Sequence, residues 1–168
     1  FGKPQPVHGV DGLDGLAAGV SSIASVALLS ILLMQHNADA TMMVLTAALA
    51  GSCFGFLPFN FNPAKTFMGD VGATFLGFIL GCTSIQGPFK TYVSFIIPFL
   101  VIGLPIFDTS FAILRRLIKG QGIMTPDRGH MHHRLIDNGF SHKTTVIILY
   151  ALSIVLAVSA IVLFISDF

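Results

Sequence analysis

Long apolar runs alternate with short polar segments along this chain. A helix needs about 20 residues to cross a bilayer core roughly 30 Å thick, and five apolar stretches approach that length. Because lipid offers no hydrogen-bond partner to an open backbone, each stretch is predicted to be helical. The five predicted crossings are Leu16 to Met34, Thr41 to Leu57, Val71 to Ile85, Thr91 to Leu114, and Thr144 to Ile165. The pattern therefore predicts an all-α fold, a polytopic membrane bundle that forms one transmembrane domain over residues 1–168.

The composition agrees with this pattern. Apolar residues make up 54% of the chain and charged residues 10%, which is too little charge to coat a soluble domain of this size. The chain contains no glutamate and no tryptophan, and its basic and acidic residues nearly balance. Net charge is therefore uninformative, and the placement of the charges carries the information.

The placement of basic residues predicts the orientation of the chain. With five crossings, every Lys and Arg except Lys90 falls on one side, together with every histidine except His36. Cytoplasmic loops carry the excess of basic residues in membrane proteins. The amino end is therefore predicted to be cytoplasmic and the carboxyl end external, with a long cytosolic loop over residues 115–143.

The five predicted crossings also bring three polar segments to the cytoplasmic face. The first segment is Asp-Gly-Leu-Asp-Gly-Leu at residues 11–16, and the second is Phe-Met-Gly-Asp at residues 67–70. The third segment, at residues 126–134, reads Pro-Asp-Arg-Gly-His-Met-His-His-Arg and lies in the predicted loop. Their common face predicts that they contribute to one site.

In the first segment, Asp11 and Asp14 stand three residues apart at the start of a predicted helix. This spacing places them on neighbouring positions of one face, and the glycine after each lets another group approach closely. The alternative is that both carboxylates only cap the helix or interact with its dipole.

Asp70 ends the second segment at the predicted membrane boundary, directly before an apolar helix. An aspartate there can hold Mg²⁺ through one oxygen and leave the other metal positions to water and phosphate. The alternative is again a helix cap.

The third segment predicts a phosphate-binding loop. His130, His132 and His133 occur beside Arg128 and Arg134, and both imidazole and guanidinium donate hydrogen bonds to phosphoryl oxygens. A zinc site is disfavoured because no cysteine lies on this face and the two adjacent histidines are expected to point in different directions. The alternative is a basic, solvated loop at the membrane surface with no catalytic role.

Two features inside the predicted crossings complete the candidates. Asp108 lies within the fourth crossing, where an ionisable group is costly enough to suggest a purpose. Its alternatives are snorkelling to the interface or pairing with Arg115 or Arg116. In the third crossing, small residues recur at helix-packing intervals and predict close helix contact; they are Gly72, Ala73, Gly77 and Gly81.

Together these features predict a cytosolic-face cleft with carboxylates for magnesium and donors for phosphate, beside lipid. Transfer of a phosphate-linked group from a soluble donor to a lipid needs such an arrangement, because the metal and the donors balance charge in the transition state. Two other classes stay open. One is a transporter or channel fragment, which would place polar residues near the bilayer midplane, and the other is a non-catalytic membrane scaffold.

The three segments resemble those of the polyprenyl-phosphate N-acetylhexosamine-1-phosphate transferases, over nearly the whole chain. The shared motifs are Asp-Gly-Leu-Asp-Gly-Leu-Ala, Phe-Asn-x-x-Pro-Ala-x-x-Phe-Met-Gly-Asp-x-Gly, and Pro-Asp-Arg-x-His-x-His-His. The His-Met-His-His form is similar to the UDP-N-acetylglucosamine (UDP-GlcNAc) branch. Within that branch, the enzymes of the wall teichoic acid linkage unit are the most similar.

The resemblance implies a reaction in which UDP-GlcNAc and undecaprenyl phosphate give undecaprenyl-diphospho-GlcNAc and UMP. It implies Mg²⁺, with Mn²⁺ as an alternative, and an enzyme of the bacterial plasma membrane with a cytosolic active face. Membrane lipid and a second copy of the chain are the other expected partners, and nucleic acid is not one.

The resemblance also assigns roles to residues. Asp70 corresponds to the magnesium-binding aspartate, and Asp11 and Asp14 belong to an acidic motif on the nucleotide side. The nucleotide pocket is implied to be lined by Asn60, Phe67 and Gly69. The diphosphate or the sugar is implied to contact His130, His132 and His133, with Arg128 and Arg134 as further substrate-binding residues.

One departure from the family limits what this chain is expected to do. The family carries a paired-aspartate motif on a cytosolic loop of an amino-terminal half, and no such pair occurs in these residues. The chain is therefore expected to be a carboxy-terminal portion of a larger transferase and to be inactive alone.

Overall fold

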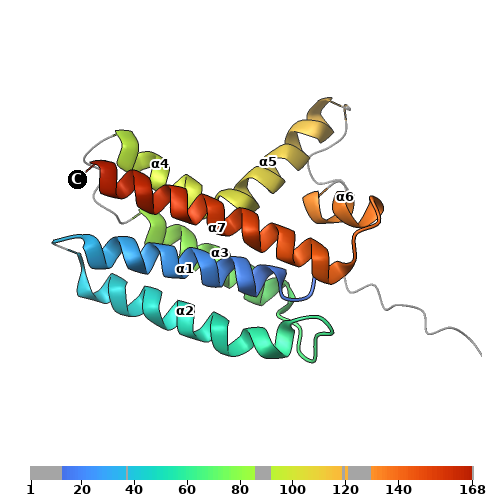
Figure 1. Cartoon of the computed structure of the whole chain (residues 1–168), viewed down its shortest axis with the longest axis horizontal. Helices are drawn as coiled ribbons and strands as arrows, with labels where there is room; N and C mark the ends of the chain where they lie inside the picture. The colour runs from blue at the N-terminus through green and yellow to red at the C-terminus, as the bar shows by residue number, and fades with distance from the viewer. Residues whose placement is uncertain (1–12, 37, 86–91, 119, 121–129, 168) are drawn as a thin grey trace, which may run out of the picture.

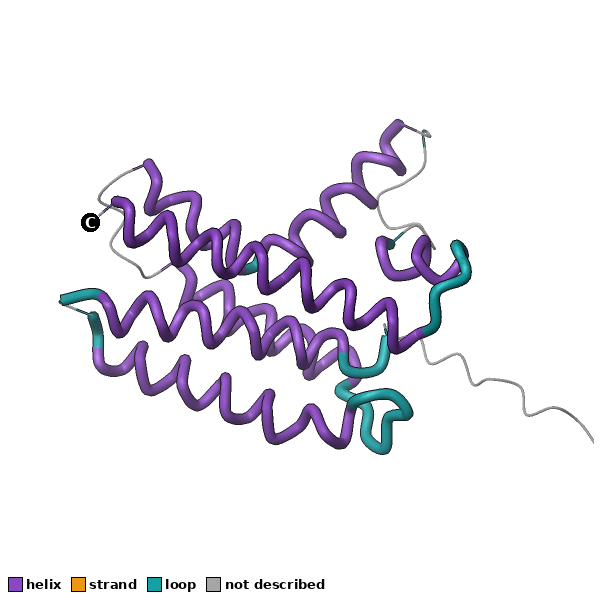
Figure 2. The backbone as a smooth tube through the Cα atoms, viewed as in Figure 1, coloured by secondary structure: helices purple, strands orange, loops and turns teal. Residues whose placement is uncertain are grey.

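The structure is a computed structural model, and it describes residues 13–36, 38–85, 92–118, 120 and 130–167. The described residues form helices and connecting turns, with no β-strand among them. The helices are α1 (Leu16–Met34), α2 (Ala40–Asn60), α3 (Gly69–Ile85), α4 (Tyr92–Val101), α5 (Gly103–Ile118), α6 (Met131–Asp137) and α7 (His142–Asp167). The all-α prediction is confirmed, and the ribbon runs back and forth along one bundle axis (Figures 1 and 2).

Three of the described helices are long and apolar enough to cross a membrane. They are Leu16–Met34, Ala40–Asn60 and His142–Ser166, and the apolar helix Gly69–Ile85 is shorter. These helices coincide with four of the five predicted crossings, with ends that differ by a few residues. The second crossing, for example, continues through Pro58 to Asn60, because the hydrogen bond from the Phe61 N–H to the Leu57 carbonyl still closes its last turn.

The fourth predicted crossing, Thr91 to Leu114, is wrong as a single helix. It breaks at Ile102 into α4 and α5, and α5 leaves the bundle at a steep angle (Figure 1). Pro105 explains the break, because it has no N–H to donate to the carbonyl of Val101 and its ring crowds that carbonyl. The carboxyl end of α5 then runs past Arg115 and Arg116 to Ile118.

The described part of the loop predicted over residues 115–143 is largely helical. It contains the end of α5, the short helix α6 and the first two residues of α7. The histidines of the third segment therefore lie at the start of a helix, which fixes their directions.

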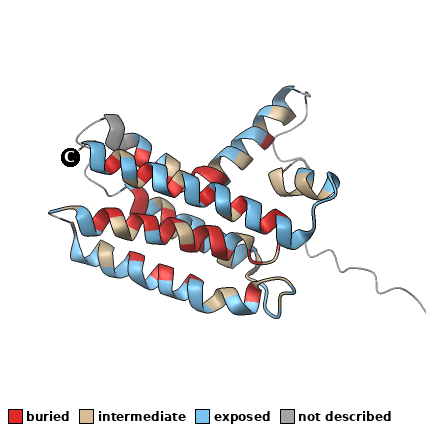
Figure 3. Ribbon diagram, in the orientation of Figure 1, coloured by how far each residue is buried: buried red, intermediate tan, exposed pale blue. Residues whose placement is uncertain are grey.

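The core of the bundle surrounds α1, whose small residues let its neighbours approach closely (Figure 3). Ala24, Ala27 and Leu28 of α1 pack in one buried cluster with residues of α2, α3, α4 and α7. Buried Ser22 and Ser25 donate to the carbonyls one turn earlier, at 2.7 Å each, so their hydroxyls are satisfied within the helix.

The small residues of α3 do not serve helix packing as predicted. Among the described residues, nothing lies within 4 Å of the position that a Cβ would take at Gly77 or Gly81. Gly77 and Ala73 line a pocket instead. The close approach to a glycine occurs on α1, where the Tyr150 ring of α7 lies against Gly19.

Candidate functional site

A pocket of about 460 Å³ opens at the end of the bundle where α1 and α3 begin and α2 ends. Figure 1 shows the start of α1, the loop after α2 and helix α6 together at this end, whereas the α1–α2 turn lies at the other. All three polar segments contribute described residues to the pocket wall, which agrees with their predicted common face.

The pocket is polar at its mouth and apolar in its interior. Apart from Ser21 of α1, the polar side chains come from five different parts of the chain and are Asp14, Asn60, Asp70, Asp108 and His132. The apolar wall is supplied mainly by α1, with α3, α5 and α7 completing it, and includes Leu16, Ala17, Val20, Ala24, Leu80, Leu104 and Leu149. Such a pocket can hold charged groups at one end and an apolar group at the other.

Asn60 joins the first and second segments. Its side-chain oxygen accepts from the Gly15 N–H at 3.1 Å, and its amide group donates to the Thr66 carbonyl at 2.9 Å. The side chain is buried, so each bond would cost a desolvated partner if it were lost. Asn60 lines this pocket, and its two hydrogen bonds hold the start of α1 to the loop after α2.

Asp14 holds the loop after α2 and does not cap α1. Its Oδ2 accepts from the Asn62 side-chain amide and from the Ala64 N–H, both at 3.2 Å. The N-cap of α1 is Gly15, in the left-handed conformation at φ 82°, which favours glycine. The capping alternative for Asp14 is therefore wrong, and neither of its two bonds uses Oδ1.

The second segment presents its side chains at the mouth. Asp70 lies exposed in the first turn of α3, and Phe67 is 69% exposed beside it. Gly69 has φ 68°, again a left-handed residue, and within the described part of the chain nothing lies within 4 Å of where its Cβ would be. All three line the pocket, so this rim is open to a ligand.

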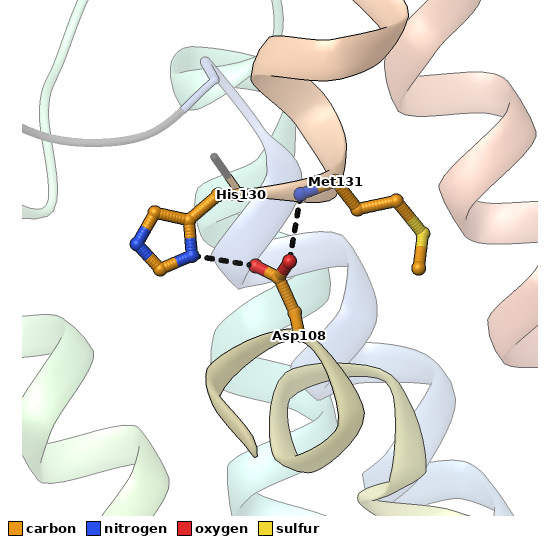
Figure 4. A network of polar contacts seen from close by, with 3 residues as sticks. All are labelled: Asp108, His130 and Met131. Atoms are coloured by element: carbon orange, nitrogen blue, oxygen red, sulfur yellow. Dashed lines mark hydrogen bonds and ion pairs between the residues drawn. The ribbon is translucent and has the colours of Figure 1, made fainter. Parts of the chain in front are cut away.

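Helix α6 is fixed to α5 through Asp108. Its Oδ1 accepts from the Met131 N–H at 2.7 Å, and its Oδ2 lies 3.0 Å from the His130 Nδ1 (Figure 4). Asp108 thus satisfies the first N–H of α6 from another helix, in the way a capping side chain would. The sequence had indicated Arg115 or Arg116 as partners for Asp108, and the structure adds His130.

The three histidines of the third segment lie together. The rings of His130 and His132 stack at 5.7 Å between centroids, and those of His132 and His133 are 4.2 Å apart. The expectation that His132 and His133 point in different directions is wrong, because the first turn of α6 lets their rings converge. Burial, reinforced by the charge of His133, lowers the pKa of His132 from 6.5 to about 4. His132 is consequently neutral at neutral pH.

The remaining candidates of the third segment are placed differently. The Arg134 guanidinium lies 5.9 Å from the centroid of the Phe111 ring on α5, a cation–π contact, and Arg134 does not line the pocket. The predictions for Asp11 and Arg128 concern residues outside the described part of the chain.

The residues fit a magnesium ion better than a zinc ion. Within the described ranges, no three His, Cys or Asp side chains are grouped closely enough to hold a metal alone. Mg²⁺ does not need such a group, because it is usually bound by one or two carboxylates with water and phosphate. The exposed Asp70 carboxylate, on a pocket that also holds Asp14 and Asp108, suits that mode.

Sequence reasoning missed Tyr150. Its hydroxyl donates to the Gly15 carbonyl at 2.5 Å, which ties α7 to the start of α1. The available signal was a lone polar aromatic residue in an otherwise apolar crossing, and such a hydroxyl usually finds a partner when buried.

The fold and the site define a polytopic helical membrane protein with a polar-mouthed pocket, to which described residues of three short motifs contribute at one end of the bundle. Residues 8–88 match the family model described as Glycosyl transferase family 4. The chain belongs to this family, within the polyprenyl-phosphate N-acetylhexosamine-1-phosphate transferases.

Similar curated proteins have related names. The chain is 42% identical over 139 residues to the "Probable undecaprenyl-phosphate N-acetylglucosaminyl 1-phosphate transferase" of Bacillus subtilis, covering 80% of the chain and 39% of the relative. It is 38% identical to a Mycolicibacterium smegmatis "Decaprenyl-phosphate N-acetylglucosaminephosphotransferase", covering 71% and 33%. It is 36% identical to the "Phospho-N-acetylmuramoyl-pentapeptide-transferase" of Rickettsia canadensis, covering 69% and 31%. The matched part of the chain thus spans 39% or less of these relatives.

Proposed function

We propose that the protein to which this chain belongs transfers GlcNAc-1-phosphate from UDP-GlcNAc to undecaprenyl phosphate and releases UMP. The observation that carries the proposal is the single pocket in which Asp14, Asp70 and His132 meet at a polar mouth above an apolar interior. A nucleotide diphosphate suits the mouth, and a lipid acceptor suits the apolar side.

The relatives support the donor sugar. The two named for N-acetylglucosamine are 42% and 38% identical to the chain, and the one named for the muramoyl pentapeptide is 36% identical. The lipid product then begins a cell-wall polymer, with the wall teichoic acid linkage unit as the first candidate. The site faces the cytosol of a bacterial plasma membrane, because the basic residues gather at its end of the bundle.

Asp70 would hold Mg²⁺, which, when bound, would neutralise the diphosphate and steady the leaving phosphate. Asp14 keeps the second segment in place through Asn62 and Ala64, which sets the position of the rim. Neutral His132 can contact an anionic ligand as a hydrogen-bond donor without adding charge.

The alternative of a transporter is less well supported by the structure. The polar side chains of this protein gather at one end of the pocket, whereas transport sites lie near the bilayer midplane. A non-catalytic scaffold is distinguished from a transferase by the experiment below.

Asp70→Asn tests the proposal, with the chain purified in detergent and titrated with UDP-GlcNAc. Mg²⁺ should strengthen nucleotide binding by the unchanged chain, and Asp70→Asn should abolish that strengthening because an amide is a poor magnesium ligand. Asp39→Asn, at the opposite end of the bundle, is the matched control and should bind as the unchanged chain does. A scaffold would be indicated if Asp70→Asn had no effect.

These 168 residues alone are proposed to be inactive, because they contain no adjacent pair of aspartates such as the family resemblance implies for binding the metal and the lipid phosphate. UMP release from UDP-GlcNAc and undecaprenyl phosphate measures the turnover, with the Bacillus subtilis relative as the positive control. A rate equal to that of the control would contradict the proposal of inactivity.

A further inference from the structure

Asp108 is a side chain whose two oxygens have different partners. Oδ1 accepts from the main-chain N–H of Met131, at 2.7 Å, and Oδ2 lies 3.0 Å from Nδ1 of His130. Figure 4 shows the carboxylate between the two, with the ring's other nitrogen, Nε2, on the far side from Asp108. The side chain of Asp108 is 23% exposed and that of His130 is 32% exposed, so their contact is partly shielded from water.

A carboxylate only accepts hydrogen bonds, so the nitrogen that faces it must carry the hydrogen. Nδ1 of His130 therefore holds the proton of the neutral ring, and Nε2 keeps its lone pair. The protonation of one histidine nitrogen is commonly set in this way, by the hydrogen bond that the other nitrogen makes.

The ring of His130 contacts the pocket wall through His132. Its ring stacks on His132, at 5.7 Å and an interplanar angle of 9°, and His132 lines the pocket wall. One turn further along each helix, Arg134 of α6 packs over the Phe111 ring of α5. Two successive contacts between α5 and α6 thus fix the direction in which the histidines point.

We propose that Asp108 is a positioning residue, which holds the proton of His130 on Nδ1, leaves Nε2 as a hydrogen-bond acceptor, and so fixes the histidine stack at the pocket. His130 does not itself line the pocket, so its effect on a ligand passes through the stacked ring of His132, which does. This consequence for ligand binding rests on the proposed function, and the tautomer itself does not.

The substitution Asp108→Asn separates positioning from simple stabilisation. The amide oxygen can still accept from Met131 N–H, so α6 keeps its first hydrogen bond. The group that then faces His130 is an NH₂ donor, which requires Nδ1 to accept and moves the ring hydrogen to Nε2. Asp108→Ala removes both the acceptor for the Met131 N–H and the group that faces His130 Nδ1.

The tautomer is measured on the chain in lipid nanodiscs, with ¹⁵N-labelled histidine and long-range ¹H–¹⁵N correlation spectra, at about pH 8, where an ordinary imidazole is neutral. The unchanged chain should show His130 with Nδ1–H. Asp108→Asn should show Nε2–H with the Met131 amide still protected from exchange, and Asp108→Ala should show neither a fixed tautomer nor that protection. UDP-GlcNAc should bind both variants about tenfold more weakly, as losses of partners that orient a histidine do.

Asp39→Ala is the matched control. Asp39 accepts from the Thr41 N–H at 2.7 Å, so it also satisfies the start of a helix, but at the other end of the bundle. Asp39→Ala should leave the tautomer of His130 and the binding of UDP-GlcNAc unchanged. A fixed Nδ1–H tautomer in Asp108→Ala, or an Nε2–H in the unchanged chain, would overturn the inference. If the tautomers behave as expected but UDP-GlcNAc does not bind the unchanged chain, the proposed function fails and the positioning role stands.

Discussion

At the scale of single residues, the site is held by side chains that bond to main-chain atoms of another segment. Asn60 reaches Gly15 and Thr66, and Asp108 reaches Met131. These bonds are partly or fully shielded, so each is worth on the order of 1 kcal/mol net and costs more when only one partner is removed. They place the candidate ligand groups Asp70 and His132 on one pocket.

His132 gives the protein a pH dependence with a definite sign. Its pKa is lowered from 6.5 to about 4 in the folded protein, so between these values the unfolded chain binds more protons than the folded one. Its contribution therefore makes stability fall as the pH drops from 6.5 towards 4. The thermal unfolding midpoint in detergent should fall more between about pH 7 and about pH 4.5 in the unchanged chain than in His132→Gln. Equal falls of the unfolding midpoint in the two proteins would contradict a lowered pKa of His132.

The sequence predicted which residues meet at the site better than it predicted how they are held. Asp14, Asp70 and His132 stand out because polar groups are scarce in an apolar chain and the number of crossings sends them to one face. Their partners could not be predicted, because a bond such as Asn60 to Gly15 depends on how α1 and α2 pack. The convergence of His132 and His133 depends on a helix start that the polar pattern did not reveal.

At the scale of helices, one glycine and one tyrosine hold the start of α1 against α7. A Cβ at Gly19 would lie 2.0 Å from the Tyr150 ring, and the Tyr150 hydroxyl bonds to the Gly15 carbonyl one turn earlier. The start of α1, which carries Asp14 beside it, is thereby fixed against α7. Sequence pattern predicted both helices but not this contact, whereas the break at Pro105 was open to prediction from a proline inside an apolar run.

Gly19→Ala should therefore separate α1 from α7. The added methyl group cannot fit against the ring, and overpacking of this kind costs about 1–3 kcal/mol. Gly51→Ala on α2 is the matched control, because nothing lies within 4 Å of its Cβ position and a helical Ala is favoured over Gly by about 0.5–1 kcal/mol. Denaturation in mixed micelles measures the free energy of unfolding of both variants. Equal stability of the two would show that Tyr150 does not constrain Gly19.

At the scale of the whole molecule, the bundle has two ends of different character. The end with the pocket carries Lys65, Arg134 and the histidines of α6, whereas the other end carries the α1–α2 turn with Gln35 and His36. The positive-inside rule predicts that the first end lies in the cytosol. Under the proposed function, the soluble donor would then enter the pocket from the cell interior.

Cysteine labelling tests this orientation. In a variant without Cys53 and Cys82, a cysteine in place of Gln35 should react with a membrane-impermeant maleimide added to intact cells. A cysteine in place of Lys65 should react only after the membrane is permeabilised. The reverse pattern would contradict the assigned orientation and, with it, the cytosolic donor.

The hydrogen bonds that hold the site together determine which of its positions can accept substitutions. Those made by Asn60, Asp14 and Asp108 end on backbone groups of Thr66, Ala64 and Met131, which every residue except proline provides in full. These bonds therefore constrain the side chains of Asn60, Asp14 and Asp108, but they do not by themselves constrain the side chains of Thr66, Ala64 and Met131. Covariation between the paired positions would accordingly not reveal these contacts.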